Sequence, residues 1–278
     1  MGGQRALATG ARRVQFAAMP ATTDLPGLAG FARQHDPDRF LCSLFAPAEA
    51  RDTLFALIAF NHELARAREA AREPMMALIR LQWWREVVEE AAAGGAPRRH
   101  EVAGPLSDAI RQGQLEPGAL LAMVEGREAE ETGEDAPPLA ERMRSTAGIM
   151  AAETGRVLGA GEAAMPGLRQ VGTAYGIGGT LRSLAVLAAQ GRDPLPPHAD
   201  PREAARSLAQ DGLSLEEAGR RSLAGLPARA VAAALPAVLA RRDLGRVLAP
   251  GWQLGDAPAP RGAGDRLAVA WAGWRGRL

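Results

Sequence analysis

Apolar residues recur every three or four positions along nearly the whole chain, and this helical spacing constrains the fold more than any other feature. From residue 48 to residue 72 the repeat predicts one long helix, which Pro74 ends. Further helices are expected over 75–93, 107–112, 117–130, 137–158, 166–190, 201–224 and 227–248. No segment of strand length alternates β-branched or aromatic residues with polar ones. We therefore predict a single all-α domain.

The two ends of the chain differ from this helical region. The first 23 residues contain arginines but no acid, which is typical of a transit peptide; the alternative is an upstream start codon, with the domain beginning near Met19. Residues 262–278 show no clear pattern. We predict a disordered extension over 1–23, a helical domain over 24–249, and a C-terminal tail over 250–278 that is either docked on the domain or free. No apolar run is long enough to span a bilayer.

Composition excludes several classes of protein. Cys42 is the single cysteine, so a disulfide framework within the chain and any multi-cysteine zinc or iron–sulfur site are ruled out. All the basic residues are arginine, which excludes Schiff-base chemistry and the lysine of a phosphate-binding loop. The 33 basic and 32 acidic residues nearly balance, and this argues against a nucleic-acid partner. The acids are nevertheless numerous enough for an enzyme that uses carboxylates.

Three segments, taken together and in order, resemble the squalene/phytoene synthase family of head-to-head prenyl synthases. They are DPDRFLCSLFAP at 36–47 with LIAFNHEL at 57–64, LQWWR at 81–85, and the pairs LR, GR and LP at 181, 191 and 195. The resemblance covers about residues 25–197 and weakens in the C-terminal third. It implies an isoprenoid-synthase-like helical bundle around a deep, apolar central cavity. It also implies a reaction in which Mg²⁺ ions, held by two aspartate-rich motifs on opposed helices, ionise prenyl diphosphates.

The chain departs from this family pattern at the first metal motif. The Asp-Asp-x-x-Asp motif of active members falls on residues 65–69. Ala65 and Arg66 replace its first two aspartates, and Glu69 is the only carboxylate left. Because Mg²⁺ requires oxygen ligands, a lone glutamate cannot hold a cluster of these ions.

The second metal motif has lost all its carboxylates. Its three acidic positions, which follow Arg182, carry Ser183, Val186 and Leu187. The predicted helix over 166–190 contains no Asp or Glu, so no shift of the alignment supplies a ligand. We therefore expect no catalytic residue, no cofactor and no metal. The degenerate positions expected to line the former site are Phe40, Asn61, Ala65, Arg66, Glu69, Arg182, Ser183, Val186 and Leu187.

Two main functions follow from the resemblance. The Asp-Pro-Asp-Arg-Phe opening and the LQWWR segment look closest to the degenerate, complex I assembly branch of the family, which implies a non-catalytic factor with protein partners such as respiratory-complex subunits. The alternative is an active prenyltransferase that condenses two prenyl diphosphates, for which Glu63, Glu69 and Glu153 would have to hold Mg²⁺ together. A third option is a carrier of an apolar or isoprenoid ligand. The expected location is the cytoplasm or the periphery of a bacterial inner membrane, or the mitochondrial matrix if residues 1–23 are a transit peptide.

Two groups of residues have more than one interpretation. Four arginines near the motifs could bind a lipid phosphate or diphosphate directly, or they could lie on a solvated helix face paired with neighbouring glutamates. These are Arg66, Arg68, Arg72 and Arg182. The four glycines of the second motif helix could allow close helix packing or leave room for a cavity. These are Gly172, Gly176, Gly178 and Gly179.

Overall fold

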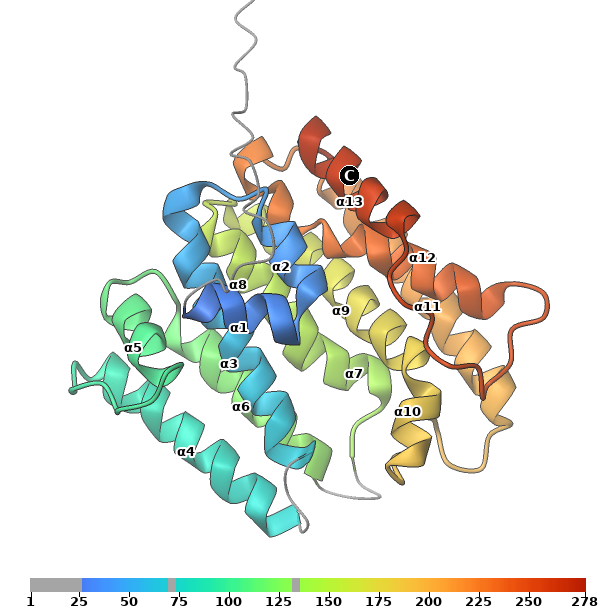
Figure 1. The fold of residues 1–278 in the computed structure, drawn as a ribbon, viewed down its shortest axis with the longest axis horizontal. Helices are drawn as coiled ribbons and strands as arrows, with labels where there is room; N and C mark the ends of the chain where they lie inside the picture. The colour runs from blue at the N-terminus through green and yellow to red at the C-terminus, as the bar shows by residue number, and fades with distance from the viewer. Residues whose placement is uncertain (1–26, 70–73, 132–135) are drawn as a thin grey trace, which may run out of the picture.

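The computed structural model describes residues 27–69, 74–131 and 136–278 (Figure 1), so the predicted extension over 1–23 lies outside the described residues. Within these ranges the chain forms helices and loops with no strand, which confirms the all-α prediction. The α-helices are α1 Leu28–His35, α2 Pro37–Ser43, α3 Arg51–Glu69, α4 Pro74–Ala92, α5 Ala103–Arg111, α6 Pro117–Glu128, α7 Leu139–Met143, α8 Ile149–Val157, α9 Met165–Arg182, α10 Leu184–Ala189, α11 Pro201–Ser222, α12 Pro236–Leu248 and α13 Ala263–Arg275.

Proline and acidic caps set where several helices begin. Proline is the first residue of α2, α6, α11 and α12, a position where the backbone has no hydrogen-bond partner to lose. The Asp36 carboxylate caps α2 by accepting a 3.0 Å hydrogen bond from the Arg39 amide. The Asp200 carboxylate caps α11 in the same way, through the Glu203 amide at 2.8 Å. None of the described helices is long and apolar enough to cross a membrane.

Two predicted helices are interrupted. The helix predicted over 166–190 is two helices, α9 and α10, because the Ser183 amide bonds to the Thr180 carbonyl in a tighter turn that ends α9. The helix predicted over 137–158 contains a π-helical turn, Arg144–Gly148, between α7 and α8. In that turn the Thr146 hydroxyl donates to the Arg142 carbonyl at 2.7 Å, and such side-chain bonds compete with the α-helical pattern.

The C-terminal third also differs from its prediction. The helix predicted over 227–248 begins as the 3-10 helix Ala228–Ala233, and α12 starts only afterwards. The patternless residues near the end of the chain form α13, which packs against α2 and α12. Val269 and Ala272 of α13 are buried against Cys42 and Leu239. Helix α13 therefore lies against the helical domain.

α9 lies near the centre of the molecule and packs against α8, α11, α12 and the π-helical turn (Figure 1). The approach to that turn is very close. A Cβ added at Gly172 would lie 2.5 Å from the Ala147 carbonyl oxygen and 2.6 Å from the Ala151 Cβ. One at Gly179 would have no heavy atom within 4 Å. Close packing therefore explains Gly172, whereas Gly179 is half-buried, faces open space and lines neither of the two described cavities.

Candidate functional site

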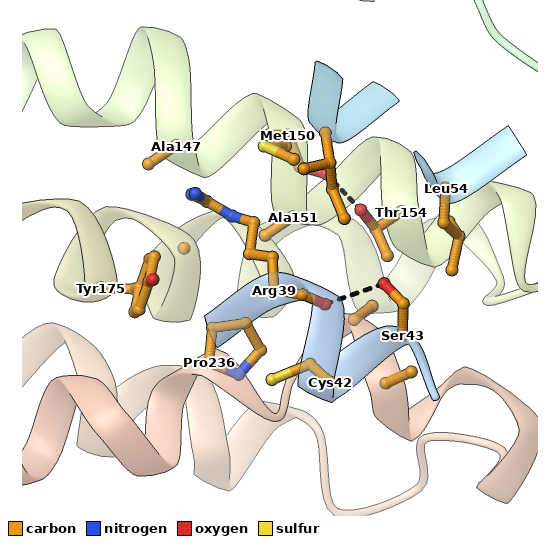
Figure 2. Close-up of a pocket in the computed structure, with 14 residues that line it drawn as sticks. Arg39, Cys42, Ser43, Leu54, Ala147, Met150, Ala151, Thr154, Tyr175 and Pro236 are labelled. Carbon is orange, nitrogen blue, oxygen red and sulfur yellow. Dashed lines mark hydrogen bonds between the residues drawn. The ribbon is translucent and has the colours of Figure 1, made fainter. Parts of the chain in front are cut away.

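The central cavity lies where α2, α3, α8, α9 and the start of α12 meet (Figure 2). Its volume is about 20 Å³, which is room for about one water molecule. Sites for organic ligands are usually several hundred Å³, so the cavity is more than tenfold too small for a prenyl chain. Within the described chain no carboxylate lines it. The lining residues are Arg39, Cys42, Ser43, Leu54, Ile58, Ala147, Met150, Ala151, Thr154, Gly172, Tyr175, Ala232, Ala233 and Pro236.

Arg39 is the charged residue of the cavity wall. Figure 2 shows its side chain reaching from α2 across the cavity, toward the helices that carry Ala147 and Tyr175. Its guanidinium lies 4.6 Å from the centre of the Tyr175 ring, and Nη1 donates to the Asp36 carboxylate at 2.7 Å. Burial lowers the pKa of Arg39, but Asp36 and Tyr175 outweigh this and raise it, so Arg39 stays charged. A permanent cation thus occupies the space that an apolar ligand would need.

The first-motif helix, α3, reaches the cavity only with its N-terminal half. Leu54 and Ile58 line the cavity, and Asn61 and Ala65 follow on the same helix face by their spacing. Both of these motif residues are half-buried, and neither lines the cavity. Phe40 lies on α2 and stacks on Phe55 of α3, with ring centres 5.6 Å apart. Phe40 therefore packs on α3 and does not line the cavity.

Arg66 of the first motif does not line the central cavity. The Arg66 side chain is 51% exposed, and one of its nitrogens lies 3.9 Å from the Glu63 carboxylate, which is a surface pair. Glu69 ends α3, and its side chain lies outside the part of the molecule that the structure describes. No described carboxylate of α3 therefore faces the cavity.

The second motif offers no acidic ligand either. Arg182, the last residue of α9, places Nε 3.8 Å from Asp243 of α12. Ser183 is half-buried at the break between α9 and α10, Val186 is 44% exposed, and Leu187 is half-buried. The contacts of Arg66 and Arg182 lead to different residues, since Arg66 lies beside Glu63 and Arg182 beside Asp243.

The four arginines proposed as an anion site do not converge. Arg66 pairs with Glu63, Arg68 donates to the Glu130 carbonyl at 3.2 Å, and Arg182 lies against Asp243. Arg72 lies outside the described residues. Each described arginine has a separate partner, so the surface interpretation holds for Arg66, and a shared site for a diphosphate does not form.

The glutamates required by the active-enzyme alternative are also apart from the central cavity. Glu63 lines a separate surface cleft of about 340 Å³ between α3 and α4. Glu153 is buried, and its carboxylate accepts hydrogen bonds from the Glu116 amide at 2.6 Å and from Arg156 at 3.2 Å. Burial raises the pKa of Glu153 despite these bonds. Among the residues with described positions, no three His, Cys, Asp or Glu side chains are grouped so that they could hold a metal ion.

A buried ion network lies beside the cavity, and its cations are arginines, among them Arg261 and Arg246. Arg261, in the segment that precedes α13, donates to Asp38 of α2 at 2.8 Å and to both oxygens of Asp243 at 2.6 and 2.7 Å. The Arg261 side chain is only 10% exposed and that of Asp243 only 1%. The Tyr175 hydroxyl donates to Asp38 at 3.4 Å, which connects the network to the cavity wall. Hydrogen bonds to both carboxylates raise the pKa of Arg261 although burial alone would lower it.

These residues do not fit a cluster of Mg²⁺ ions. The motif positions carry no described carboxylate, and the nearby acids Asp38 and Asp243 are already neutralised by arginine. Asp38 belongs to the segment that carries the family resemblance, and Tyr175 is the single tyrosine of the chain. Asp38 and Tyr175 could therefore have been singled out from the sequence as candidate members of the network. Nothing in the sequence pointed to Arg261 or Asp243.

Comparison with known proteins assigns the family. The model of the squalene/phytoene synthase family matches residues 32–199, which is more than half of the chain. The chain belongs to the squalene/phytoene synthase family. Two solved structures of this family share its fold. A dehydrosqualene synthase aligns with a TM-score of 0.72 and 15% identity, over 89% of this chain and 94% of that one. The squalene synthase HpnC from Alicyclobacillus acidocaldarius aligns with a TM-score of 0.66 and 18% identity, over 80% and 91%.

Curated relatives within the family carry a different name. The human protein called NADH dehydrogenase (ubiquinone) complex I, assembly factor 6 is 38% identical over 96 residues, which is 34% of this chain and 28% of the human protein. The homolog of that factor in Drosophila melanogaster is 28% identical over 169 residues, which is 56% of this chain and 49% of the fly protein. The matches thus span from about a quarter to about half of these relatives.

Proposed function

We propose that this chain is a non-catalytic member of the squalene/phytoene synthase family that acts in the assembly of respiratory complex I by binding protein partners. The observation that carries the proposal is the loss of aspartate from both metal motifs in a chain whose curated relatives are named complex I assembly factors. The small central cavity and its resident Arg39 support it, because they leave little room for a prenyl substrate between α2, α3, α8 and α9. The proposed factor needs no Mg²⁺ and works in the cytoplasm or at the inner membrane of a bacterium, or in the mitochondrial matrix.

Co-purification tests the proposal directly. When the tagged chain is expressed in its native cells at its normal level, subunits of complex I or their assembly intermediates are expected to co-purify with it. A tagged dehydrosqualene synthase expressed in the same cells is the control, because it has the same fold. Equal recovery of these subunits with both proteins would contradict the proposal.

The alternative function, a prenyltransferase, has its own test. Purified protein supplied with Mg²⁺ and farnesyl diphosphate is expected to release no pyrophosphate above the rate measured without protein, because neither motif can neutralise the leaving group. An active squalene synthase in the same assay provides the positive control. Sustained pyrophosphate release by this chain, lost when Glu63 is changed to Gln, would restore the enzymatic interpretation.

A further inference from the structure

One face of α13 is apolar and uncovered. Leu267, Trp271 and Trp274 are 68%, 58% and 63% exposed, whereas most large apolar side chains of the chain are buried or half-buried. Their spacing of four and then three residues places them on a single helix face. The two indole rings lie 5.3 Å apart, so they form one continuous surface. Figure 1 shows α13 at the edge of the molecule beside α12.

The opposite face of α13 is fixed to the domain. Val269 and Ala272 are buried, and Gly273 allows the ring of Phe45 to approach the helix so closely that a Cβ there would lie 2.5 Å from it. Asp265 is 2% exposed and binds Arg242 at 2.5 Å and Arg246 at 2.8 Å. One face of α13 is therefore packed against the domain, and the face that carries Leu267, Trp271 and Trp274 points outward.

The exposed charged side chains of the α13 segment, residues 261–278, are all arginines. Arg266, Arg275 and Arg277 are exposed, and the guanidinium of Arg275 lies 5.8 Å from the centre of the Trp271 ring. Asp265 is the only acid between residues 261 and 278, and it is buried and paired. An apolar face bordered by exposed arginines, with no exposed acid in the same segment, is complementary to a negatively charged, partly apolar surface.

We propose that α13 docks on the surface of an anionic lipid bilayer, with Trp271 and Trp274 at the level of the headgroups and the arginines against lipid phosphates. Tryptophan is enriched at membrane interfaces because its ring is apolar and its N–H is polar. Basic residues beside it add attraction to anionic lipids. A second copy of the chain is a poorer occupant. The three side chains offer on the order of 400 Å², whereas a stable protein interface buries about 800 Å² on each partner.

Vesicle flotation with the purified full-length chain tests this inference, which does not rest on the proposed assembly function. The chain is expected to float with vesicles of phosphatidylcholine and phosphatidylglycerol, more weakly with pure phosphatidylcholine, and less as salt is raised. Its tryptophan emission is expected to shift to shorter wavelength on binding. The double variant Trp271→Ala/Trp274→Ala should lose about tenfold or more in affinity, because two indoles no longer enter the interface. Arg275→Gln/Arg277→Gln should weaken binding to the anionic vesicles only.

A matched control comes from α4, where Met75 and Ile79 are 63% and 54% exposed. The variant Met75→Ala/Ile79→Ala removes apolar surface of similar exposure elsewhere and is expected to bind vesicles as the unchanged chain does. Absence of flotation by the unchanged chain, or equal flotation by the tryptophan variant, would overturn the inference. A tryptophan-dependent dimer in light scattering without vesicle binding would also overturn it, and would assign the face to a second copy.

Discussion

Replacing Arg261 with Ala is expected to lower the free energy of unfolding by about 3 kcal/mol, because it breaks a buried ion pair, although Arg246 still donates to Asp243 at 2.8 Å. The guanidinium of Arg261 is the group that joins Asp38 of α2 to Asp243 of α12. Because Asp243 is 1% exposed, water cannot replace the lost hydrogen bonds. Urea denaturation at neutral pH measures the change through the midpoint and slope of the transition.

The matched control for this prediction is Arg266→Ala. Arg266 is an exposed residue of α13, and its replacement is expected to change the stability by no more than about 0.5 kcal/mol. A loss below about 1 kcal/mol for Arg261→Ala would mean that the network contributes little, as surface ion pairs do.

Replacing Gly172 with Ala is expected to lower the free energy of unfolding by about 2 kcal/mol. The added methyl would lie 2.5 Å from a backbone oxygen of the π-helical turn, so the two helices must separate. Overpacking of this kind costs about 1–3 kcal/mol or more, against a gain of up to about 1 kcal/mol from the better helix propensity of alanine. Thermal and urea unfolding of the purified variant measure the difference.

Gly179→Ala is the matched control on the same helix and is expected to have the opposite sign. A Cβ at this position meets no heavy atom within 4 Å, so only the helix propensity changes. The variant should therefore be more stable by about 0.5–1 kcal/mol. Equal destabilisation by both substitutions would show that close packing at Gly172 is not the reason.

Local sequence signals predicted the first and largest part of the fold. The helices now seen as α3 and α4 follow from regular apolar spacing and from Pro74, which the chain places between them. The break at Ser183 and the π-helical turn were missed because hydrogen bonds within a single turn cause them, and apolar spacing does not report such bonds. Helix α13 was missed because it is stabilised by distant residues, among them Arg246 and Leu239.

The candidate site, like the fold, could be predicted from the sequence only in part. The loss of metal ligands could be predicted, since it depends only on which residues occupy the acidic positions of the two motifs. The small cavity and the arginines beside it could not, because their contacts join distant parts of the chain. Tyr175 lies 137 residues from Asp38, and Arg261 lies 223 residues from it. No pattern within one helix reports such pairs.

Deletion of this chain in its native cells, with complex I and isoprenoids measured together, distinguishes the proposed assembly role from a prenyltransferase. Assembled complex I, measured on native gels and by NADH oxidation, is expected to fall several-fold while squalene and carotenoid levels stay unchanged. A plasmid copy should restore complex I, and so should one that carries Glu63→Gln and Glu69→Gln, because no metal chemistry is involved. Normal complex I together with altered isoprenoids in the deletion strain would contradict the account.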